Sequence, residues 1–188
     1  MLSIKKLFKN KLNQTMAEEY TPCKKLWDDI QRDYYFCDEM GNYRPTGQKG
    51  FLNKELFLKG NKYYVIPRYF DSGTLKLIVE DESENDVFSV VILYGSRFSN
   101  PNQYILYIED FSRLTDSRCG IGTEMLEYIK RMAKDRGFNI IGVHAVAAPN
   151  ACKGAMNQEQ LEAFYEEKLN DKSIRLEYMN NSDDVNRL

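Results

Sequence analysis

The sequence has little of what metal and membrane proteins depend on. It contains one histidine, His144, and its four cysteines form no Cys-x-x-Cys pair. Because a zinc site needs clustered cysteine or histidine ligands, no metal is expected, and scattered cysteines in a chain of 188 residues indicate a reduced, cytoplasmic protein. No apolar run approaches the roughly 18–20 residues that cross a membrane. The net charge of -2 gives no reason to expect nucleic acid as a partner.

Charge is nevertheless distributed unevenly along the chain. Residues 1–15 contain four lysines and no acid, without the apolar stretch that follows the basic start of a signal peptide. We interpret them as a basic leader helix that packs or frays, with contact to a membrane or an acidic partner as the alternative. Residues 16–180 are expected to form a single domain and residues 181–188 a loose tail.

Aromatic and β-branched residues are abundant and occur in runs. The runs at 62–70, 74–80 and 87–95 are typical of strands, and the short turns between them indicate an antiparallel meander. Before them, the sequence predicts a helix over 23–36 and a short helix over 51–58, with a glycine-containing loop at 41–50 between the two.

The second half of the chain has a different pattern. Apolar strands are expected at 103–111 and 138–147, joined by an amphipathic helix that ends at Gly137, which makes a parallel βαβ unit. A helix over 158–169 and a strand over 173–179 follow. This order predicts an α+β fold, in which helices flank a mixed, mostly antiparallel central sheet and the βαβ unit binds the ligand.

A glycine loop opens the helix of the βαβ unit. Its residues 117–122 read "SRCGIG", and the glycines lack Cβ atoms that would keep a ligand from the backbone. Unpaired amides and the positive end of the helix dipole suit a phosphate group. The loop is neither a nucleotide P-loop, because no Lys-Ser/Thr follows, nor a dinucleotide site, because Met125 occupies the third glycine position. By itself it fits an anion cradle or a plain turn.

The run from about 103 to 179 resembles the core of the GNAT-superfamily N-acetyltransferases. The resemblance rests on "SRCGIG" followed by "LEAFYEEKLND" at 161–171, in the family's order of elements. It implies an acetyltransferase-like fold, acetyl-coenzyme A as co-substrate, and transfer of the acetyl group to the amine of a small molecule or a protein. Ser117 stands where the family has Gln or Arg, so a weakly active or inactive binding protein of this fold is the alternative.

The resemblance also implies which residues hold the coenzyme. Backbone amides at the end of the 103–111 strand and in the glycine loop would contact it, and the side chain of Arg118, within the loop, would add positive charge. This set comprises Asp110, Phe111, Arg113, Arg118, Cys119, Gly120, Ile121, Gly122 and Thr123. Tyr165 matches the family's acid, a phenol that protonates the departing thiolate, and a packed core aromatic is the alternative for it.

Two residues are candidates for the base that accepts the amine proton. Glu109 is a carboxylate in an apolar strand just before the loop, where burial would suit it to this role, and an outward position or a salt bridge is its alternative. His144 lies in the partner strand and is the second candidate, because imidazole titrates near neutral pH. A lone histidine in an apolar strand is more often a structural, hydrogen-bonded residue, and this is the alternative for His144.

Overall fold

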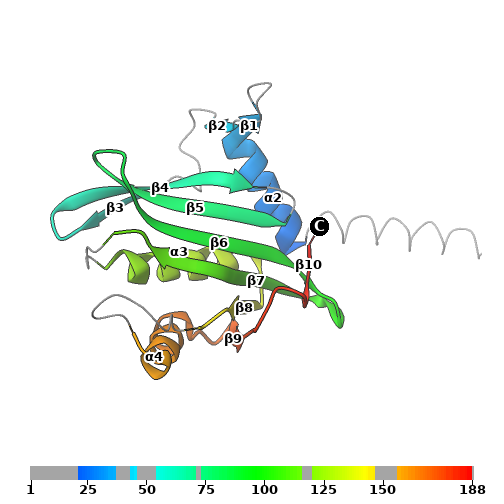
Figure 1. Cartoon of the computed structure of the whole chain (residues 1–188). Coiled ribbons are helices and arrows are strands. Elements are labelled where there is room, and N and C mark those ends of the chain that lie inside the picture. Colours follow the sequence, from blue (N-terminus) through cyan, green and yellow to red (C-terminus); the bar gives the residue numbers. More distant parts are fainter. Residues whose placement is uncertain are drawn as a thin grey trace, which may run out of the picture.

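The computed structural model describes residues 21–36, 43–45, 54–70, 73–115, 120–146 and 156–187. In this part of the chain, eight strands form one mixed sheet, and helices pack against it (Figure 1). The predicted α+β class is therefore confirmed. The predicted basic leader at 1–15 lies outside the described residues.

The antiparallel part of the sheet is the predicted meander with one strand added in front. Each strand pairs with the next in the chain, and the order is β3 (Lys54–Leu58), β4 (Asn61–Phe70), β5 (Thr74–Asp81), β6 (Asp86–Arg97) and β7 (Asn100–Arg113). The last two strands are longer than predicted. They turn tightly at residues 98–99, so the segment 95–102 is a hairpin end.

The predicted helix over 51–58 is wrong, because this segment contains the edge strand β3. Lys59 and Gly60 both have positive φ, at 51° and 83°, as a two-residue hairpin turn requires. Leu56 faces the core while Phe57 is 72% exposed, which is the alternation of a strand. Lysine at the first turn position hid this hairpin, because Asn-Gly and Asp-Gly are the usual signals.

The first helix is also shorter than predicted. Helix α2 (Pro22–Asp33) ends before three aromatic residues, which form β1 (Tyr34–Phe36) and pair with β2 (Tyr43–Pro45). The predicted extension of the helix to residue 36 is wrong, because aromatic residues favour strands, and these three pair with β2 instead of adding a helical turn. The predicted loop at 41–50 contains β2, and its other residues lie outside the described part.

The second half of the chain follows the prediction closely. Helix α3 (Ile121–Arg136) ends at Gly137, and β8 (Ile140–Val143) runs parallel to β7. Helix α4 (Gln158–Leu169) begins at a capping box between Asn157 and Gln160, and β9 (Arg175–Tyr178) lies parallel to β8. Strand β8 is shorter than the predicted 138–147. Its chain bends after Val143, where the amide of Val146 donates to the carbonyl of His144.

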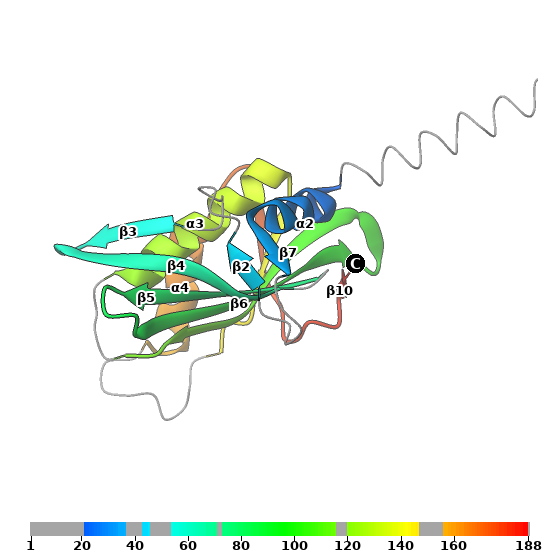
Figure 2. The same ribbon diagram turned by 90° about the horizontal axis from the view of Figure 1, so that it is seen from above.

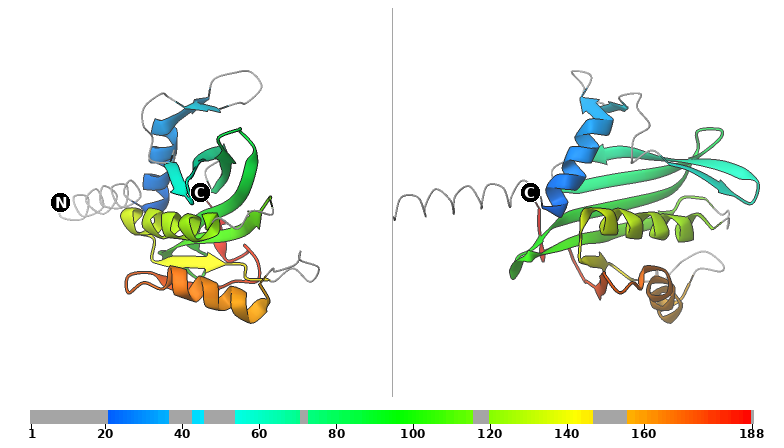
Figure 3. Two further views of the ribbon diagram at one scale, coloured as in Figure 1. Left: turned by 90° about the vertical axis from the view of Figure 1, so that its left-hand side faces the viewer. Right: turned by 180° about the vertical axis from the view of Figure 1, so that it is seen from behind.

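Helices α2, α3 and α4 cover one face of the sheet. Their apolar side chains share a single core with alternate residues of the strands, including Leu26 of α2, Ile129 of α3 and Leu169 of α4. In the right-hand view of Figure 3, which looks at the molecule from behind, α2 and α3 lie between the viewer and the sheet. The view from above in Figure 2 shows both helices on the same side of the sheet. Helix α4 lies beside α3, where the ammonium of Lys130 donates to the carbonyl of Lys168 at 2.6 Å.

The C-terminal segment is not the predicted loose tail. Residues Val185–Arg187 form β10, which pairs with the end of β6 from Gly95 to Arg97. This part of β6 lies past Leu93, where its pairing with β5 stops. Val185 joins a second apolar cluster on the sheet face opposite the helices. A Cβ atom on Gly95 would lie 2.2 Å from the carbonyl oxygen of Asn186, so this glycine allows β10 to approach. The short sequence of β10 has little periodicity of its own, and its order depends on β6.

Replacing Gly137 by alanine is expected to destabilise the protein by about 1–2 kcal/mol, because Gly137 holds φ 86° at the end of α3. Its amide donates to the carbonyls of Ala133 and Lys134. The matched control is Gly122→Ala within the helix, where the added Cβ meets Phe111 at an ordinary 3.5 Å. That change should stabilise by about 0.5–1 kcal/mol. Urea unfolding measures both, and equal effects would contradict the prediction.

Candidate functional site

The candidate site lies where β7 and β8 part. The two strands pair from Ile105 to Ile108, and the last contact is the amide of His144 donating to the carbonyl of Ile108 at 3.2 Å. Strand β7 continues to Arg113, while β8 has already ended at Val143. Among the described residues, the far end of β7 therefore has no strand partner on the β8 side. We call this opening the wedge.

A β-bulge at Glu109 marks the start of the wedge. Ile108 pairs with Ile92 and Asp110 with Val91, so Glu109 has no opposite residue in β6. An extra residue bends a strand and changes where the next side chains point. Both carboxylates are exposed, and the Ser112 hydroxyl donates to Asp110. Of the two alternatives for Glu109, the structure shows the outward position and not the buried one, because the bulge places it outside the apolar faces of β7.

The N-terminus of α3 lies over the end of β7. A Cβ atom on Gly122 would be 3.5 Å from Phe111 of β7 and 3.7 Å from Phe88 of β6. Gly120 caps the helix with φ 90°, and a Cβ atom there would meet nothing within 4 Å. The amides of the first turn have no partner within the helix and face open space at Gly120. This end of the helix is therefore able to hold an anion.

One residue works against anion binding at this end. Glu124 lies in the first turn of α3, where its carboxylate already interacts favourably with the helix dipole. Arg118 and Cys119, which were predicted to contribute beside the glycines, lie outside the described residues. The described part of the cradle consists of backbone amides from Gly120 to Thr123.

Tyr165 of α4 closes the wedge on the helix side. Its ring lies 6.1 Å from the ring of Phe111, which in turn packs edge-on against Phe88 at 4.8 Å. Burial, and then the charges of Asp110 and Tyr178, raise the pKa of Tyr165 to about 12. Tyr165 thus remains a neutral proton donor at any physiological pH. It is 3% exposed and belongs to the helix-side core, so the packing role is present as well.

His144 lies on the other side of the wedge. It follows β8 directly and is exposed, and its Nδ1 atom is 3.4 Å from the hydroxyl of Tyr107. Tyr107 belongs to the apolar cluster opposite the helices. Because the amide of His144 bonds to the carbonyl of Ile108, the backbones of Glu109 and His144 are neighbours at the β7–β8 junction, while Tyr165 and the start of α3 lie on the helix side. Arg113, at the end of β7, is exposed and has other interactions.

Sequence reasoning missed three residues that shape the wedge. Phe88 supplies part of its aromatic floor, Tyr107 contacts His144, and Glu124 adds charge at the helix end. Phe88 and Tyr107 look like ordinary apolar strand residues in the sequence. Glu124 is the exception, because an acid four residues after a glycine cap is a readable first-turn signal.

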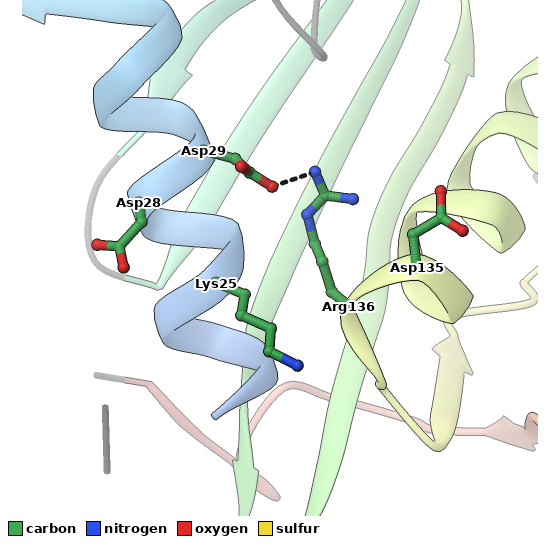
Figure 4. Close-up of a pocket in the computed structure, with 5 residues that line it drawn as sticks. All are labelled: Lys25, Asp28, Asp29, Asp135 and Arg136. Carbon is green, nitrogen blue, oxygen red and sulfur yellow. Dashed lines mark hydrogen bonds and ion pairs between the residues drawn. The ribbon is translucent and has the colours of Figure 1, made fainter. Parts of the chain in front are cut away.

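A separate hollow lies at the opposite end of α3, between this helix and α2 (Figure 4). It has a volume of about 510 Å³ and is lined by Lys25, Asp28, Asp29, Asp135 and Arg136. Arg136 is 4% exposed, and its guanidinium pairs with Asp29 across the two helices. This arginine also lies in the last turn, where a cation interacts favourably with the helix dipole. The pair therefore explains how α2 is held against α3 and suggests no chemistry.

The described residues contain neither a candidate metal site nor a candidate membrane span. No group of three or more His, Cys, Asp or Glu side chains is placed to hold a metal ion in this part of the chain. Of the helices that the structure describes, none is both long and apolar enough to cross a membrane.

Comparisons with known proteins reach only part of the chain. No family model and no curated protein matches it. An aminoglycoside acetyltransferase from an uncultured soil metagenomic sample is 22% identical over 42% of this chain and 51% of its own, with a TM-score of 0.37. A candidate acetyl transferase from Pyrococcus furiosus is 19% identical over 57% and 66%, with a TM-score of 0.40. A transcriptional regulator from Bacillus halodurans is 17% identical over 56% and 64%, with a TM-score of 0.41. These likenesses are partial, so the wedge residues themselves have to support any conclusion about function.

Alkaline pH is expected to destabilise the protein through two buried acids. Burial raises the pKa of the Cys23 thiol from 9.0 to about 12, and that of Tyr165 from 10.0 to about 12. Because the unfolded chain releases these protons first, stability is complete below about pH 9 and falls as pH rises toward 12. Each group contributes at most about 1.4 kcal/mol per pH unit.

Urea unfolding between about pH 8 and about pH 10.5 measures this loss. Cys23→Ala removes the thiol, so its unfolding free energy should fall less steeply above about pH 9 than that of the wild type. Parallel pH curves for the two proteins would show that Cys23 does not carry the effect.

Proposed function

We propose that the protein is an acyl-coenzyme A-dependent N-acyltransferase, which transfers an acetyl group from acetyl-coenzyme A to an amine. The observation that carries this proposal is the wedge. The unpaired end of β7 lies beside the open N-terminus of α3, and the proton donor Tyr165 lies against it. This combination provides sites for an anion, an extended amide-containing arm and a leaving group.

The described residues fit the coenzyme in two respects. The amides from Gly120 to Thr123 would hold its pyrophosphate, because Gly120 leaves open space in front of the helix end. The edge of β7 from Asp110 to Arg113 would pair with its amide-containing arm, much as an added strand pairs with a sheet. An amide of the same strand would polarise the thioester carbonyl.

The coenzyme supplies an activated thioester, and the protein moves two protons. As the amine nitrogen bonds to the carbonyl carbon, Glu109 or His144 accepts a proton from that nitrogen. As the carbon–sulfur bond breaks, Tyr165 donates its hydroxyl proton to the sulfur. Its pKa of about 12 keeps the hydroxyl protonated until the thiolate departs, and the same shift makes it a weaker acid than an ordinary phenol.

Calorimetry with acetyl-coenzyme A, followed by an assay of thiol release, tests the proposal. The acceptor panel should include a polyamine, an aminoglycoside, a peptide with a free N-terminus and a lysine peptide. We expect micromolar binding and turnover with at least one acceptor. Absence of binding at several hundred micromolar acetyl-coenzyme A would overturn the proposal.

A second function is favoured by one specific observation. Tyr165 is 3% exposed and packs in the core, and Glu109 is exposed to solvent. Both environments are also those of ordinary structural residues, a core aromatic and a surface carboxylate. A binding protein of this fold would hold acetyl-coenzyme A without reacting. Binding in the calorimeter with no thiol release on the whole amine panel would support this alternative.

A further inference from the structure

Tyr107 is held rigidly at the junction of β7 and β8. It is fully buried, with 0% exposure, and pairs in register with Gly142 of β8. A Cβ atom on Gly142 would lie 2.9 Å from Cδ2 of Tyr107 and 2.4 Å from Sδ of Met179. The glycine therefore makes room for both side chains, and the phenol ring has little freedom to move.

The hydroxyl of Tyr107 needs a partner because it is buried. Its hydrogen-bond partner among the described residues is Nδ1 of His144, at 3.4 Å, which is the long end of the range for such a bond. The backbone of His144 is itself fixed, since its amide donates to Ile108 and its carbonyl accepts from Val146. The position of the imidazole is thus set by the backbone hydrogen bonds of His144 and by the hydrogen bond between its ring and Tyr107.

The direction of this bond follows from the two groups. Burial, and then the charge of Glu109, raise the pKa of Tyr107, so the phenol keeps its proton. A buried hydroxyl donor is satisfied only if it donates, and Nδ1 is the acceptor within reach. An Nδ1 atom that accepts a hydrogen bond carries no proton of its own, so in neutral imidazole the proton resides on Nε2.

We propose that Tyr107 is a positioning residue that holds His144 with its protonated Nε2 directed outward at the wedge. His144 then offers a hydrogen-bond donor to the bound substrate, and Glu109 is left as the base. The catalytic part of this inference rests on the proposed acyltransferase function. The arrangement of Tyr107 and His144 does not, and it can be tested in the free protein.

Nitrogen-15 NMR of the full chain, with labelled histidine, tests the arrangement directly. Because the sequence contains one histidine, the spectrum shows a single imidazole. At about pH 8.5, where ordinary imidazole is neutral, we expect an unprotonated Nδ1 and a protonated Nε2. A protonated Nδ1 would overturn the proposal.

Two variants separate Tyr107 from a general loss of structure. Tyr107→Phe keeps the ring but removes the donor, so the Nδ1 resonance should move. Tyr94→Phe removes a hydroxyl from an equally buried tyrosine on the helix side of the sheet, and should leave the imidazole resonances in place. An unmoved Nδ1 resonance in Tyr107→Phe would show that the hydroxyl does not hold the ring.

Kinetics test the catalytic part. Glutamine retains an outward N–H donor but cannot act as a base, so His144→Gln should keep at least about tenfold more kcat than His144→Ala. Equal losses in the two variants would overturn the donor role of His144. If no amine is acetylated at all, the proposed function fails, and the NMR measurement still decides the arrangement of Tyr107 and His144.

Discussion

Replacing Gly120 by aspartate is expected to lower the affinity for acetyl-coenzyme A by at least about 100-fold, which is about 2.7 kcal/mol. A side chain at Gly120 projects into open space at the start of α3, because its Cβ atom would meet nothing within 4 Å. A carboxylate there would occupy the position proposed for the pyrophosphate. Like charges brought together at a binding site cost several kcal/mol.

Gly120→Asn is the matched control for this experiment. Gly120 has φ 90°, and asparagine and aspartate tolerate the left-handed region to a similar degree. The two variants should therefore have similar stability in urea, and they differ mainly in charge. We expect Gly120→Asn to weaken binding only several-fold in calorimetry. Equal affinities for the two variants would mean that the start of α3 does not hold the anionic part of the coenzyme.

Replacing Tyr165 by phenylalanine is expected to lower kcat by about 100- to 10,000-fold, the range for loss of a general acid. The phenylalanine ring keeps the contacts with Phe111 at 6.1 Å and Phe164 at 6.0 Å, so the core should remain packed. Because the change removes only the hydroxyl, the affinity for acetyl-coenzyme A should stay within about threefold, which is less than 1 kcal/mol.

The control for Tyr165→Phe is Tyr128→Phe. Tyr128 is 4% exposed in α3 and belongs to the same helix-side core, so this variant also removes the hydroxyl of a buried tyrosine, two turns along α3 from the helix N-terminus. Its kcat should stay close to that of the wild type. Steady-state kinetics with the best acceptor provide the measurement. If Tyr165→Phe keeps full kcat, Tyr165 is a packing residue, and the leaving thiolate obtains its proton elsewhere.

The parts of the fold that were predicted correctly have local causes. Helix α3 could be recognised because its apolar residues repeat on one face and Gly137 adopts the left-handed cap that glycine favours. Helix α4 could be recognised from the Asn157–Gln160 capping box and the apolar positions up to Leu169. In both helices, the residues that determine the structure are neighbours in the chain.

The parts that were missed depend on contacts between distant residues. The strand β3 is stabilised by pairing with β4, and β10 by pairing with β6, and neither segment has a strong strand pattern alone. The bulge at Glu109 is similar, because an extra residue in β7 is defined only by its register against β6. This bulge also explains why Glu109 is exposed although it stands in an apolar run.

The sequence by itself determined the α+β class, the βαβ unit, the glycine loop and the candidates Glu109, His144 and Tyr165. The class, the βαβ unit, the loop and the candidates Glu109 and His144 follow from periodicity, caps and residue chemistry, which act over a few neighbouring positions. The candidate Tyr165 came from the family resemblance of its segment. Only the tertiary structure decided which of them share the wedge and in what environment. It buried Tyr165 against Phe111, exposed Glu109 and placed Tyr107 beside His144. The physical reason is that burial and charge at a site come from the strands and helices packed around it, which the local sequence does not encode.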